Sequence, residues 1–252
     1  MSTLRKFVDD YRLVRAEEGF AIPDPEYARQ LPYRDITGRN AASWRARAFH
    51  YLIIRLALQM VRAGTPGAPR ILDLGAGNGW MALRLARSFR VTALDVDGGD
   101  TGLGSLRDHR VARVVSDIEA LPLRAGSFDA VIAAATLHYA VDLSGALAEA
   151  ARVLRPGGLL IIADSPVYAD AAARDEAWQR TLAHYAAFGA PHLAARYHGL
   201  TRSQLDAPGL FRFVTASPGF TSRRAALRGW RHDGLRLPVL LGWKRDDQRP
   251  TD

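Results

Sequence analysis

The sequence predicts an α/β fold built on a mostly parallel sheet, and three observations support that prediction. From residue 70 onward, short apolar runs rich in β-branched residues alternate with stretches of helical periodicity, as a parallel sheet with crossover helices requires. A glycine cluster joins the first of these runs to the first helix. The chain has 252 residues, of which 48% are hydrophobic, and this is enough for one large domain with a buried core.

The expected strands and helices alternate along the chain. Strands are expected at residues 70–74, 91–95, 111–116, 128–134 and 159–163, with helices at residues 80–89 and 143–154. The segment RPGG at residues 155–158 ends the second helix, because proline cannot continue it and glycine tolerates the turn. The C-terminal part is expected to add a helix at 171–188, a short helix at 203–206 capped by Thr201, and two last strands at 210–216 and 237–243.

The N-terminal part differs in pattern from the rest. Residues 1–20 and 41–63 have helical character, and prolines separate them. Ligands bind at the carboxyl edge of the sheet in folds of this kind. We therefore expect residues 1–65 to form a helical lid across that edge.

Composition excludes several classes of function. The chain contains no cysteine, which excludes disulfides, thiolate metal sites and cysteine nucleophiles. The longest apolar run, residues 49–61, is interrupted by Arg55 and is too short to span a bilayer. The N-terminus lacks the apolar segment of a secretory signal. These observations lead us to expect a cytoplasmic protein.

The net charge of +8 is unevenly distributed. Residues 1–70 and residues 200–252 each carry a net charge of +5, whereas residues 71–199 carry −2. Such basic flanks attract phosphate backbones or anionic small molecules. However, 32 of the 34 basic residues are arginine, and we favour an arginine-rich bias with solvated helix faces over nucleic-acid binding.

The glycine cluster lies in the segment ILDLGAGNGW at residues 71–80. Its spacing is G-x-G-x-G, not the G-x-G-x-x-G that packs a pyrophosphate against a helix. Asp73 precedes the turn, and a carboxylate at the mouth of the site repels a pyrophosphate but suits a cationic ligand. Asp95, at the end of the second strand, offers the pair of acceptor oxygens that a ribose diol requires.

This segment resembles the class I S-adenosylmethionine-dependent methyltransferases, in particular the small-molecule "type 11" branch with the ubiquinone/menaquinone-type enzymes. Three further segments agree in order, and they are VSDIEALPL at 115–123, GSFDAVI at 126–132 followed by LHY, and RVLRPGG at 152–158. The resemblance covers about residues 69–165. It implies a Rossmann-like, seven-stranded, mostly parallel sheet with helices on both faces, an antiparallel strand near the C-terminus, and the N-terminal helical lid. Residues 66–252 then form the cofactor-binding domain, with residues 165–235 shaping an acceptor pocket.

The resemblance also implies S-adenosyl-L-methionine as the cofactor and assigns residues to it. Those expected around the methionine moiety, the ribose and the adenine are, in chain order, Asp73, Gly75, Ala76, Gly77, Asp95, Val96, Asp117, Ile118 and Ala134. For Gly79, contact with the cofactor and packing between helix and strand are equally open. The stretch DGGDTGLG at 97–104 departs from the family's pattern, in which a short helix starts here.

The acceptor side has weaker signals. Catalytic candidates near the carboxyl edge are His138, Tyr139 and Asp164, and candidates for the wall of the acceptor pocket are Tyr11, Tyr33, Arg39, Trp44 and Tyr168. Arg39 is a candidate partner for the carboxylate of the cofactor. No metal is expected, because the rim lacks a cluster of Asp and Asn ligands.

The leading functional hypothesis is methyl transfer to a small-molecule acceptor at O, N or C, giving S-adenosylhomocysteine. Two alternatives stay open, namely an RNA- or protein-modifying enzyme that uses the basic flanks, and a cofactor-binding protein without transferase activity. Nucleic acid is the less favoured partner because the fourth strand ends in AAAT and not in the NPPY-type motif of amino-methylating nucleic-acid enzymes. The apolar helix at 49–61 weakly suggests a lipid-like acceptor. The oligomeric state stays open.

Overall fold

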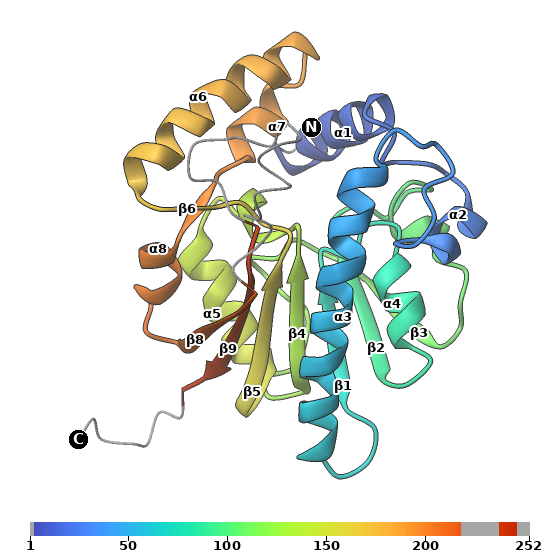
Figure 1. The fold of residues 1–252 in the computed structure, drawn as a ribbon, viewed down its shortest axis with the longest axis vertical. Coiled ribbons are helices and arrows are strands. Elements are labelled where there is room, and N and C mark those ends of the chain that lie inside the picture. Colours follow the sequence, from blue (N-terminus) through green and yellow to red (C-terminus); the bar gives the residue numbers. More distant parts are fainter. Residues whose placement is uncertain (1–2, 218–236, 246–252) are drawn as a thin grey trace.

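A seven-stranded sheet forms the centre of the molecule (Figure 1). The computed structural model describes residues 3–217 and 237–245. The strand order is β3-β2-β1-β4-β5-β9-β8, and β9 runs antiparallel to both of its neighbours. The strands are β1 (Arg70–Leu74), β2 (Arg90–Asp95), β3 (Val111–Val115), β4 (Phe128–Ala134), β5 (Leu154–Ala163), β8 (Phe211–Ser217) and β9 (Val239–Lys244). The predicted mostly parallel sheet with an antiparallel strand near the C-terminus is confirmed.

The predicted helices also lie close to their expected places, whereas the helices Pro25–Gln30 and Pro191–Arg196 were not predicted. The described helices are α1 (Thr3–Glu17), α2 (Pro25–Gln30), α3 (Ala41–Ala63), α4 (Trp80–Leu85), α5 (Leu143–Val153), α6 (Ala171–Ala187), α7 (Pro191–Arg196) and α8 (Arg202–Asp206). A two-stranded sheet pairs β6 (Val167–Tyr168) with β7 (Leu200–Thr201). Thr201 caps α8, with Gln204 completing a capping box. Helix α4 is shorter than the predicted helix at 80–89, since its last residue is Leu85.

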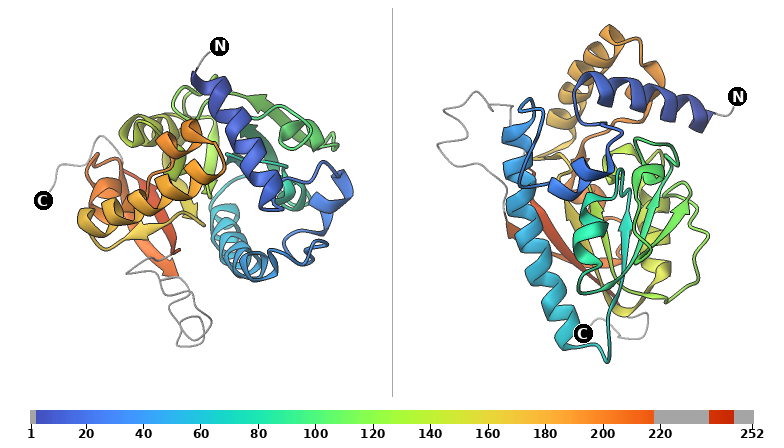
Figure 2. Two further views of the ribbon diagram at one scale, coloured as in Figure 1. Left: turned by 90° about the horizontal axis from the view of Figure 1, so that it is seen from above. Right: turned by 90° about the vertical axis from the view of Figure 1, so that its right-hand side faces the viewer.

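Two apolar layers hold helices against the two faces of the sheet. Alternate residues of a strand point to opposite faces, so Ile71 belongs to one cluster and Leu72 to the other. Ile54 and Leu58 of α3 join the first cluster, whereas Leu147 of α5 joins the second. Figure 2 shows α3 and α4 against one face, with α5 on the opposite side. The central strands β1 and β4 are therefore buried on both faces, as in sheets of this type, whereas the edge strand β3 is largely exposed.

The carboxyl edge of the sheet is covered by α1 together with α6 and α7, which lie side by side above the strands (Figures 1 and 2). Residues 1–65 are divided between two places. Helix α1 crosses the carboxyl edge, whereas α3 runs along a face of the sheet because one side of the helix is apolar and fully buried. Of the residues 1–65 that were expected to form a lid, α1 thus lies over the carboxyl edge, whereas most of α3 lies on a face of the sheet. Among the described helices, none is both long and apolar enough for a bilayer crossing.

Candidate cofactor and acceptor site

The turn after β1 places three glycines in left-handed backbone conformations, and each has a different reason. A Cβ on Gly75 would lie 2.3 Å from the Thr136 hydroxyl, and one on Gly79 would lie 2.9 Å from Leu106. These two glycines are thus required by protein packing, which favours the packing role for Gly79. A Cβ on Gly77 would meet nothing within 4 Å. Its backbone therefore faces open space into which a ligand fits.

Asp95 is fixed by the loop that it faces. Its Oδ2 accepts a hydrogen bond from the Gly77 amide at 2.8 Å, and its Oδ1 accepts one from the Asp97 amide at 2.8 Å. Burial raises the pKa of Asp95 to about 6, and the two amide donors oppose that rise. The carboxylate is held in one orientation and keeps lone pairs for two further donors.

Asp73 lies behind the glycine loop, which differs from the position at the mouth that the sequence suggested. The residue is 2% exposed, it lines neither of the two cavities described below, and its Oδ2 has no hydrogen-bond partner among the described residues. Burial, with the nearby charge of Asp95, raises the pKa of Asp73 to about 7. A buried acceptor without a donor is costly, so this carboxyl is an unusual feature in need of a reason.

A first cavity opens at the ends of β1, β2 and β3. Of the residues expected to bind the cofactor, it is lined by Gly75, Asp95, Val96, Asp117 and Ile118. Helix α1 supplies its other wall through Phe7, Val8 and Tyr11, which the sequence did not indicate as a group.

Asp117 has two contacts in this first cavity. Its Oδ1 accepts a hydrogen bond from the Glu119 amide at 3.3 Å, and its Oδ2 lies 3.5 Å from Nη1 of Arg196. The guanidinium of Arg196 lies over the ring of Phe7, 5.0 Å from its centroid. Helix α7 therefore supplies a cation at this end of the site.

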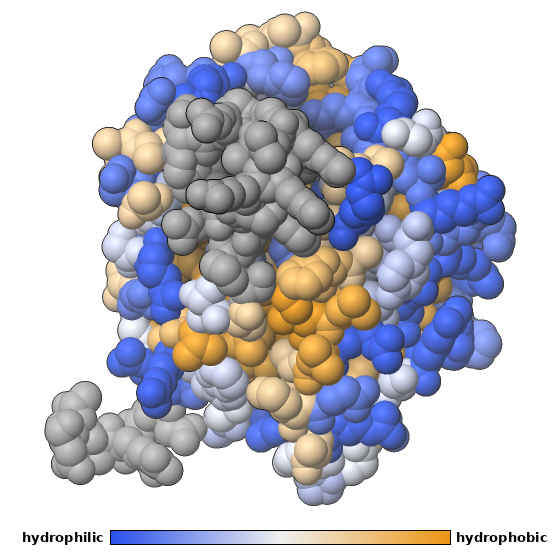
Figure 3. All heavy atoms as spheres, viewed as in Figure 1, coloured by the Kyte–Doolittle hydropathy of each residue, from blue (hydrophilic) through white to orange (hydrophobic). Residues whose placement is uncertain are grey.

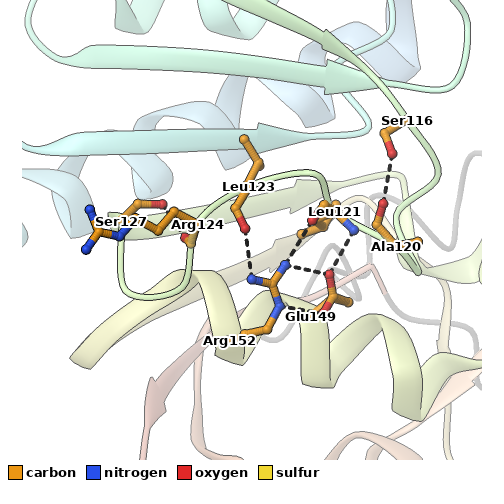
Figure 4. A network of polar contacts seen from close by, with 8 residues as sticks. All are labelled: Ser116, Ala120, Leu121, Leu123, Arg124, Ser127, Glu149 and Arg152. Carbon is orange, nitrogen blue, oxygen red and sulfur yellow. Dashed lines mark hydrogen bonds and ion pairs between the residues drawn. The ribbon is translucent and has the colours of Figure 1, made fainter.

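The loop that carries Asp117 and Ile118 is held from below by a network of polar contacts (Figure 4). Arg152 of α5 donates to the carbonyls of Leu123 and Leu121 at 2.8 and 2.9 Å and pairs with Glu149. Glu149 in turn accepts from the Leu121 amide at 2.8 Å. Arg152, the first residue of the RVLRPGG segment, thus anchors the loop.

A second cavity of about 360 Å³ adjoins the first and extends from the glycine loop to the ends of β4 and β5. Gly75, Ala76, Gly77 and Ala134 line it on the cofactor side. On the far side it is lined by six of the remaining candidates, namely His138, Tyr139, Asp164, Tyr11, Trp44 and Tyr168. The two cavities share Gly75, Asp95, Tyr11 and Tyr139 among their walls, so they form one continuous site.

Comparison with known proteins agrees with this geometry. The family model described as a methyltransferase domain matches residues 72–162. A malonyl-[acyl-carrier protein] O-methyltransferase of Geobacter sulfurreducens is 37% identical over 139 residues, which cover 52% of this chain and 51% of the relative. A demethylmenaquinone methyltransferase of Mycolicibacterium gilvum is 40% identical over 98 residues, covering 38% of this chain and 42% of the relative. The chain thus spans about half, or less, of the length of these relatives.

Among solved structures, the geranyl diphosphate C-methyltransferase from Streptomyces coelicolor A3(2), in complex with Mg²⁺, geranyl diphosphate and S-adenosyl-L-homocysteine, is similar in fold. The TM-score is 0.54 at 18% identity, and the alignment covers 76% of this chain and 77% of that chain. Residues 72–162 therefore form a methyltransferase domain, on a sheet with the class I methyltransferase fold. S-adenosylmethionine is the cofactor of this domain.

The residues of the methyltransferase domain fit that cofactor. Gly77 leaves open space beside its backbone, Asp95 has a fixed carboxylate for a diol, and Ala134 lines the same cavity at the end of β4. The unpartnered Oδ2 of Asp73 lies beneath the loop. A ligand with an ammonium group and a sulfonium is stabilised by these buried carboxylates, whereas a pyrophosphate is not.

His138 lies deep in the acceptor side of the methyltransferase domain. It is 4% exposed, and its Nδ1 lies 3.1 Å from the Ser165 hydroxyl. Burial, together with the charges of Arg15 and Arg47, lowers the pKa of His138 to about 3. The imidazole is therefore neutral at physiological pH and acts as a hydrogen-bonding group.

Asp164 is held by a partner that the sequence did not indicate. Its Oδ1 lies 2.7 Å from Nδ1 of His50, a fully buried residue of α3. Asp164 has φ 55° directly after β5, and Ala135 has φ 56° directly after β4. Non-glycine residues in this conformation store strain that the surrounding structure must hold, and such residues cluster at functional sites.

Two arginines of the N-terminal helices also line the second cavity, and neither was predicted. Arg15 donates to the hydroxyls of Tyr139 and Tyr185 and pairs with Glu18. The guanidinium of Arg47 lies over the rings of Trp44 and Phe20, with distances of 4.6 and 4.9 Å to the centroids.

No carboxylate of the described residues pairs with Arg47, so its charge is available to a ligand. Trp44 and Arg47 lie three residues apart on one helix, so their side chains are neighbours. This spacing is the signal in the sequence that could have identified Arg47.

The structure corrects two candidates for the acceptor wall. Tyr33 is 57% exposed and stacks under the guanidinium of Arg84, outside both cavities. Arg39 donates to the carbonyl of Glu17 and packs beside Gly19, so it lies outside the cavities as well. Both residues belong to the loop after α2, which folds back on the end of α1 and not over the site. The place expected for Arg39 is taken by Arg47.

Proposed function

We propose that this chain transfers a methyl group from S-adenosylmethionine to a small-molecule acceptor. The observation that supports this proposal most is the second cavity, which joins the glycine loop to His138 and Asp164 beneath α1. A reaction site of about 360 Å³ under a helical cover suits a small molecule better than a polymer. The relatives are named for a carrier-bound malonyl group and for demethylmenaquinone, and for this chain we carry over only the small acceptor group.

The residues on the cofactor side would bind and orient. S-adenosylmethionine supplies, when bound, a methyl group on a sulfonium that a nucleophile displaces in line. Asp95 accepts the ribose hydroxyls, and the Ala134 carbonyl accepts from the ammonium group. Arg47 pairs with the carboxylate, the role expected of Arg39, because its stacked guanidinium lines the cavity and pairs with no carboxylate of the described residues.

The remaining cofactor residues would enclose the adenine. Val96 and Ile118 flank the ring, and Asp117 accepts from its amino group while Arg196 keeps the carboxylate in place. Asp73, with its buried and unpartnered oxygen, supplies negative charge behind the loop. Catalysis in this reaction comes mostly from orientation and from exclusion of water.

The cover over the cavity is held by contacts from α1. Arg12 pairs with Asp97 beside the first cavity, and Asp10 accepts from the His192 amide of α7 at 2.8 Å. Arg15 also donates a hydrogen bond to the Tyr139 hydroxyl, so three contacts hold α1 over the site. An RNA or protein substrate would require α1 to move away, which disfavours the alternative that uses the basic flanks.

Asp164 is the best-placed general base on the acceptor side. His50 occupies Oδ1, while Oδ2 has no hydrogen-bond partner among the described residues and the side chain lines the cavity. It would take the proton from an acceptor that must lose one. His138 is a neutral hydrogen-bonding group, and Tyr11, Tyr139, Trp44 and Tyr168 form the aromatic wall. The proposal includes the cytoplasmic location expected from the sequence.

The test has two stages. Titration calorimetry is expected to show binding of S-adenosylhomocysteine and none of NADH. A panel of small hydroxyl, amine and activated-carbon acceptors is then screened for release of S-adenosylhomocysteine from S-adenosylmethionine. Tight NADH binding without binding of the adenosyl compound would refute the cofactor assignment. Cofactor binding without turnover on any small acceptor, but with turnover on bulk RNA, would refute the acceptor class.

A further inference from the structure

An apolar stripe runs along the outer side of α3, opposite the face that packs on the sheet. Leu52, Leu56 and Met60 are 48%, 68% and 57% exposed, at a spacing that keeps them on one side of a helix. Phe49, half-exposed, continues the stripe by one turn. Figure 3 shows the apolar side chains gathered over α3 in the middle of that face. A single exposed leucine is ordinary, but a row of them on one helix marks an interaction surface.

The charged side chains of α3 itself all have one sign. Helix α3 contains no aspartate or glutamate over its 23 residues. Arg45, Arg55 and Arg62 are exposed on it, and within residues 3–217 and 237–245 no carboxylate pairs with any of them. An apolar stripe flanked by unpaired arginines matches an amphipathic helix that lies in the interface of an anionic bilayer.

The position and charge of this face favour one kind of binding partner over another. Among the described elements, α3 is the outermost layer over its face of the sheet, so the stripe points away from the rest of the described molecule (Figure 2). A second copy of the chain would bring arginines against arginines, which opposes self-association. We propose that this stripe docks the protein on an anionic phospholipid surface.

Docking would also place the reaction site beside the lipid. Trp44 and Arg47, which line the second cavity, belong to the N-terminal part of the same helix. The surface contact would leave the cover of α1 in place, since α1 lies across the carboxyl edge and not on this face. The proposal does not depend on the transferase activity, because vesicle binding is measured without an acceptor.

Co-sedimentation with vesicles tests this surface directly. The full chain is expected to partition onto vesicles of mixed phosphatidylcholine and phosphatidylglycerol, and only weakly onto phosphatidylcholine alone. Substitution L56Q/M60Q is expected to weaken partitioning about tenfold or more, because two partly inserted apolar side chains are lost. The matched control V141Q/V214Q changes two residues that are 63% and 42% exposed elsewhere, and it is expected to bind as the unchanged protein does.

A second variant separates charge from apolar contact. Each arginine near an anionic surface strengthens binding about fivefold, so R45Q/R55Q/R62Q is expected to lose most of the dependence on phosphatidylglycerol. Unchanged affinity for S-adenosylhomocysteine shows that the variants are folded. Equal sedimentation of the protein and L56Q/M60Q on the mixed vesicles would overturn the proposal. A dimer in light scattering that L56Q/M60Q converts to a monomer would also overturn it, in favour of a second copy.

Discussion

The two halves of the site are built in different ways. On the cofactor side the contacts are local to neighbouring strand ends, since Asp95 bonds to amides only 18 and 2 residues away. On the acceptor side they join distant parts of the chain, with His50 and Asp164 separated by 114 residues and Arg15 and Tyr139 by 124. The ribose end of the cofactor half is thus a property of the sheet, and α1 and α7 complete only its adenine end. The acceptor half depends on how the outer helices dock.

This difference indicates where the specificity of the protein lies. Strand ends of a fixed sheet present the same backbone groups whatever covers them, so one cofactor suits many relatives. The outer helices bring Arg15 and His50 to the acceptor side, and a change in how these residues are placed alters the acceptor more than the cofactor. If the comparison holds, variants in the two halves have separable effects on binding and on turnover.

The largest expected effect is on turnover in the acceptor half. With an acceptor that the screen identifies, D164N is expected to lower kcat by about 10²-fold or more, because a general base contributes on that scale. Asparagine tolerates the left-handed backbone at φ 55°, so the fold is kept. Affinity for S-adenosylhomocysteine, measured by calorimetry, is expected to stay within about threefold.

The control for D164N is R39Q, which changes a sequence candidate that the structure places outside both cavities. It is expected to leave both kcat and cofactor affinity unchanged. H50Q is expected to lower kcat less than D164N and to shift the pH profile of kcat, since His50 acts through Asp164. Equal loss of cofactor affinity and of turnover in D164N would show that the two halves are not separable.

The second expected effect is on binding in the cofactor half. D95N places an amide NH₂ where a carboxylate oxygen now accepts from a backbone N–H. Hydrogen bonds to a charged group contribute about 1.5–3 kcal/mol, so the affinity for S-adenosylhomocysteine is expected to fall about 30-fold or more. Calorimetry gives the value, and D175N, in an exposed pair on α6, serves as the control. An unchanged affinity would remove Asp95 from the ribose site.

The difference between the cofactor half and the acceptor half also explains which parts of the site the sequence predicted. The strand order, the glycine loop and the positions of Asp95 and Asp117 follow from patterns within one βαβ unit, where spacing fixes the geometry. The roles of Gly75 and Gly79 were not accessible, because their partners Thr136 and Leu106 are remote in sequence. The burial of Asp73 was missed for a related reason, since sequence shows that a carboxylate precedes the turn but not which way it points.

The acceptor half was predicted only in part. Residues next to strand ends, such as His138 and Asp164, were found because every parallel strand ends at the same edge. Arg39 was predicted and Arg47 was not, because only the docking of α3 decides which arginine of the N-terminal stretch lines the cavity. Motif spacing therefore does not predict which residues of the outer helices line the cavity.

The third expected effect concerns the stability of the ligand-free protein. Because the pKa of Asp73 is raised to about 7 from 3.8, the folded state holds a proton that the unfolded chain has lost between those values. The stability that this group contributes therefore falls as pH rises from about 4 to about 7. D73N removes that loss, and urea unfolding is expected to show D73N more stable by about 4 kcal/mol near pH 8 and equal near pH 4.

The outcome distinguishes two uses of the Asp73 carboxyl. If D73N stabilises the free protein and weakens binding of S-adenosylhomocysteine, the buried charge is kept for the cofactor at the expense of stability. A variant that is less stable at both pH values would show that Asp73 has a structural partner, contrary to its unpartnered Oδ2. Asp73 would then no longer be a residue whose charge is kept for the cofactor half.

The smallest expected effect lies where the two halves meet, at the contact between α1 and the loop after β2. Arg12 donates through Nε to Oδ1 of Asp97 at 3.0 Å, but its side chain is 39% exposed, so water and salt weaken the pair. R12Q is expected to weaken binding of S-adenosylhomocysteine about threefold to fivefold at low ionic strength, and less at high ionic strength. R29Q, which breaks an exposed pair with Glu26 on α2, should change nothing. A loss for R12Q as large as that for D95N would mean that the cover, and not the strand ends, determines cofactor affinity.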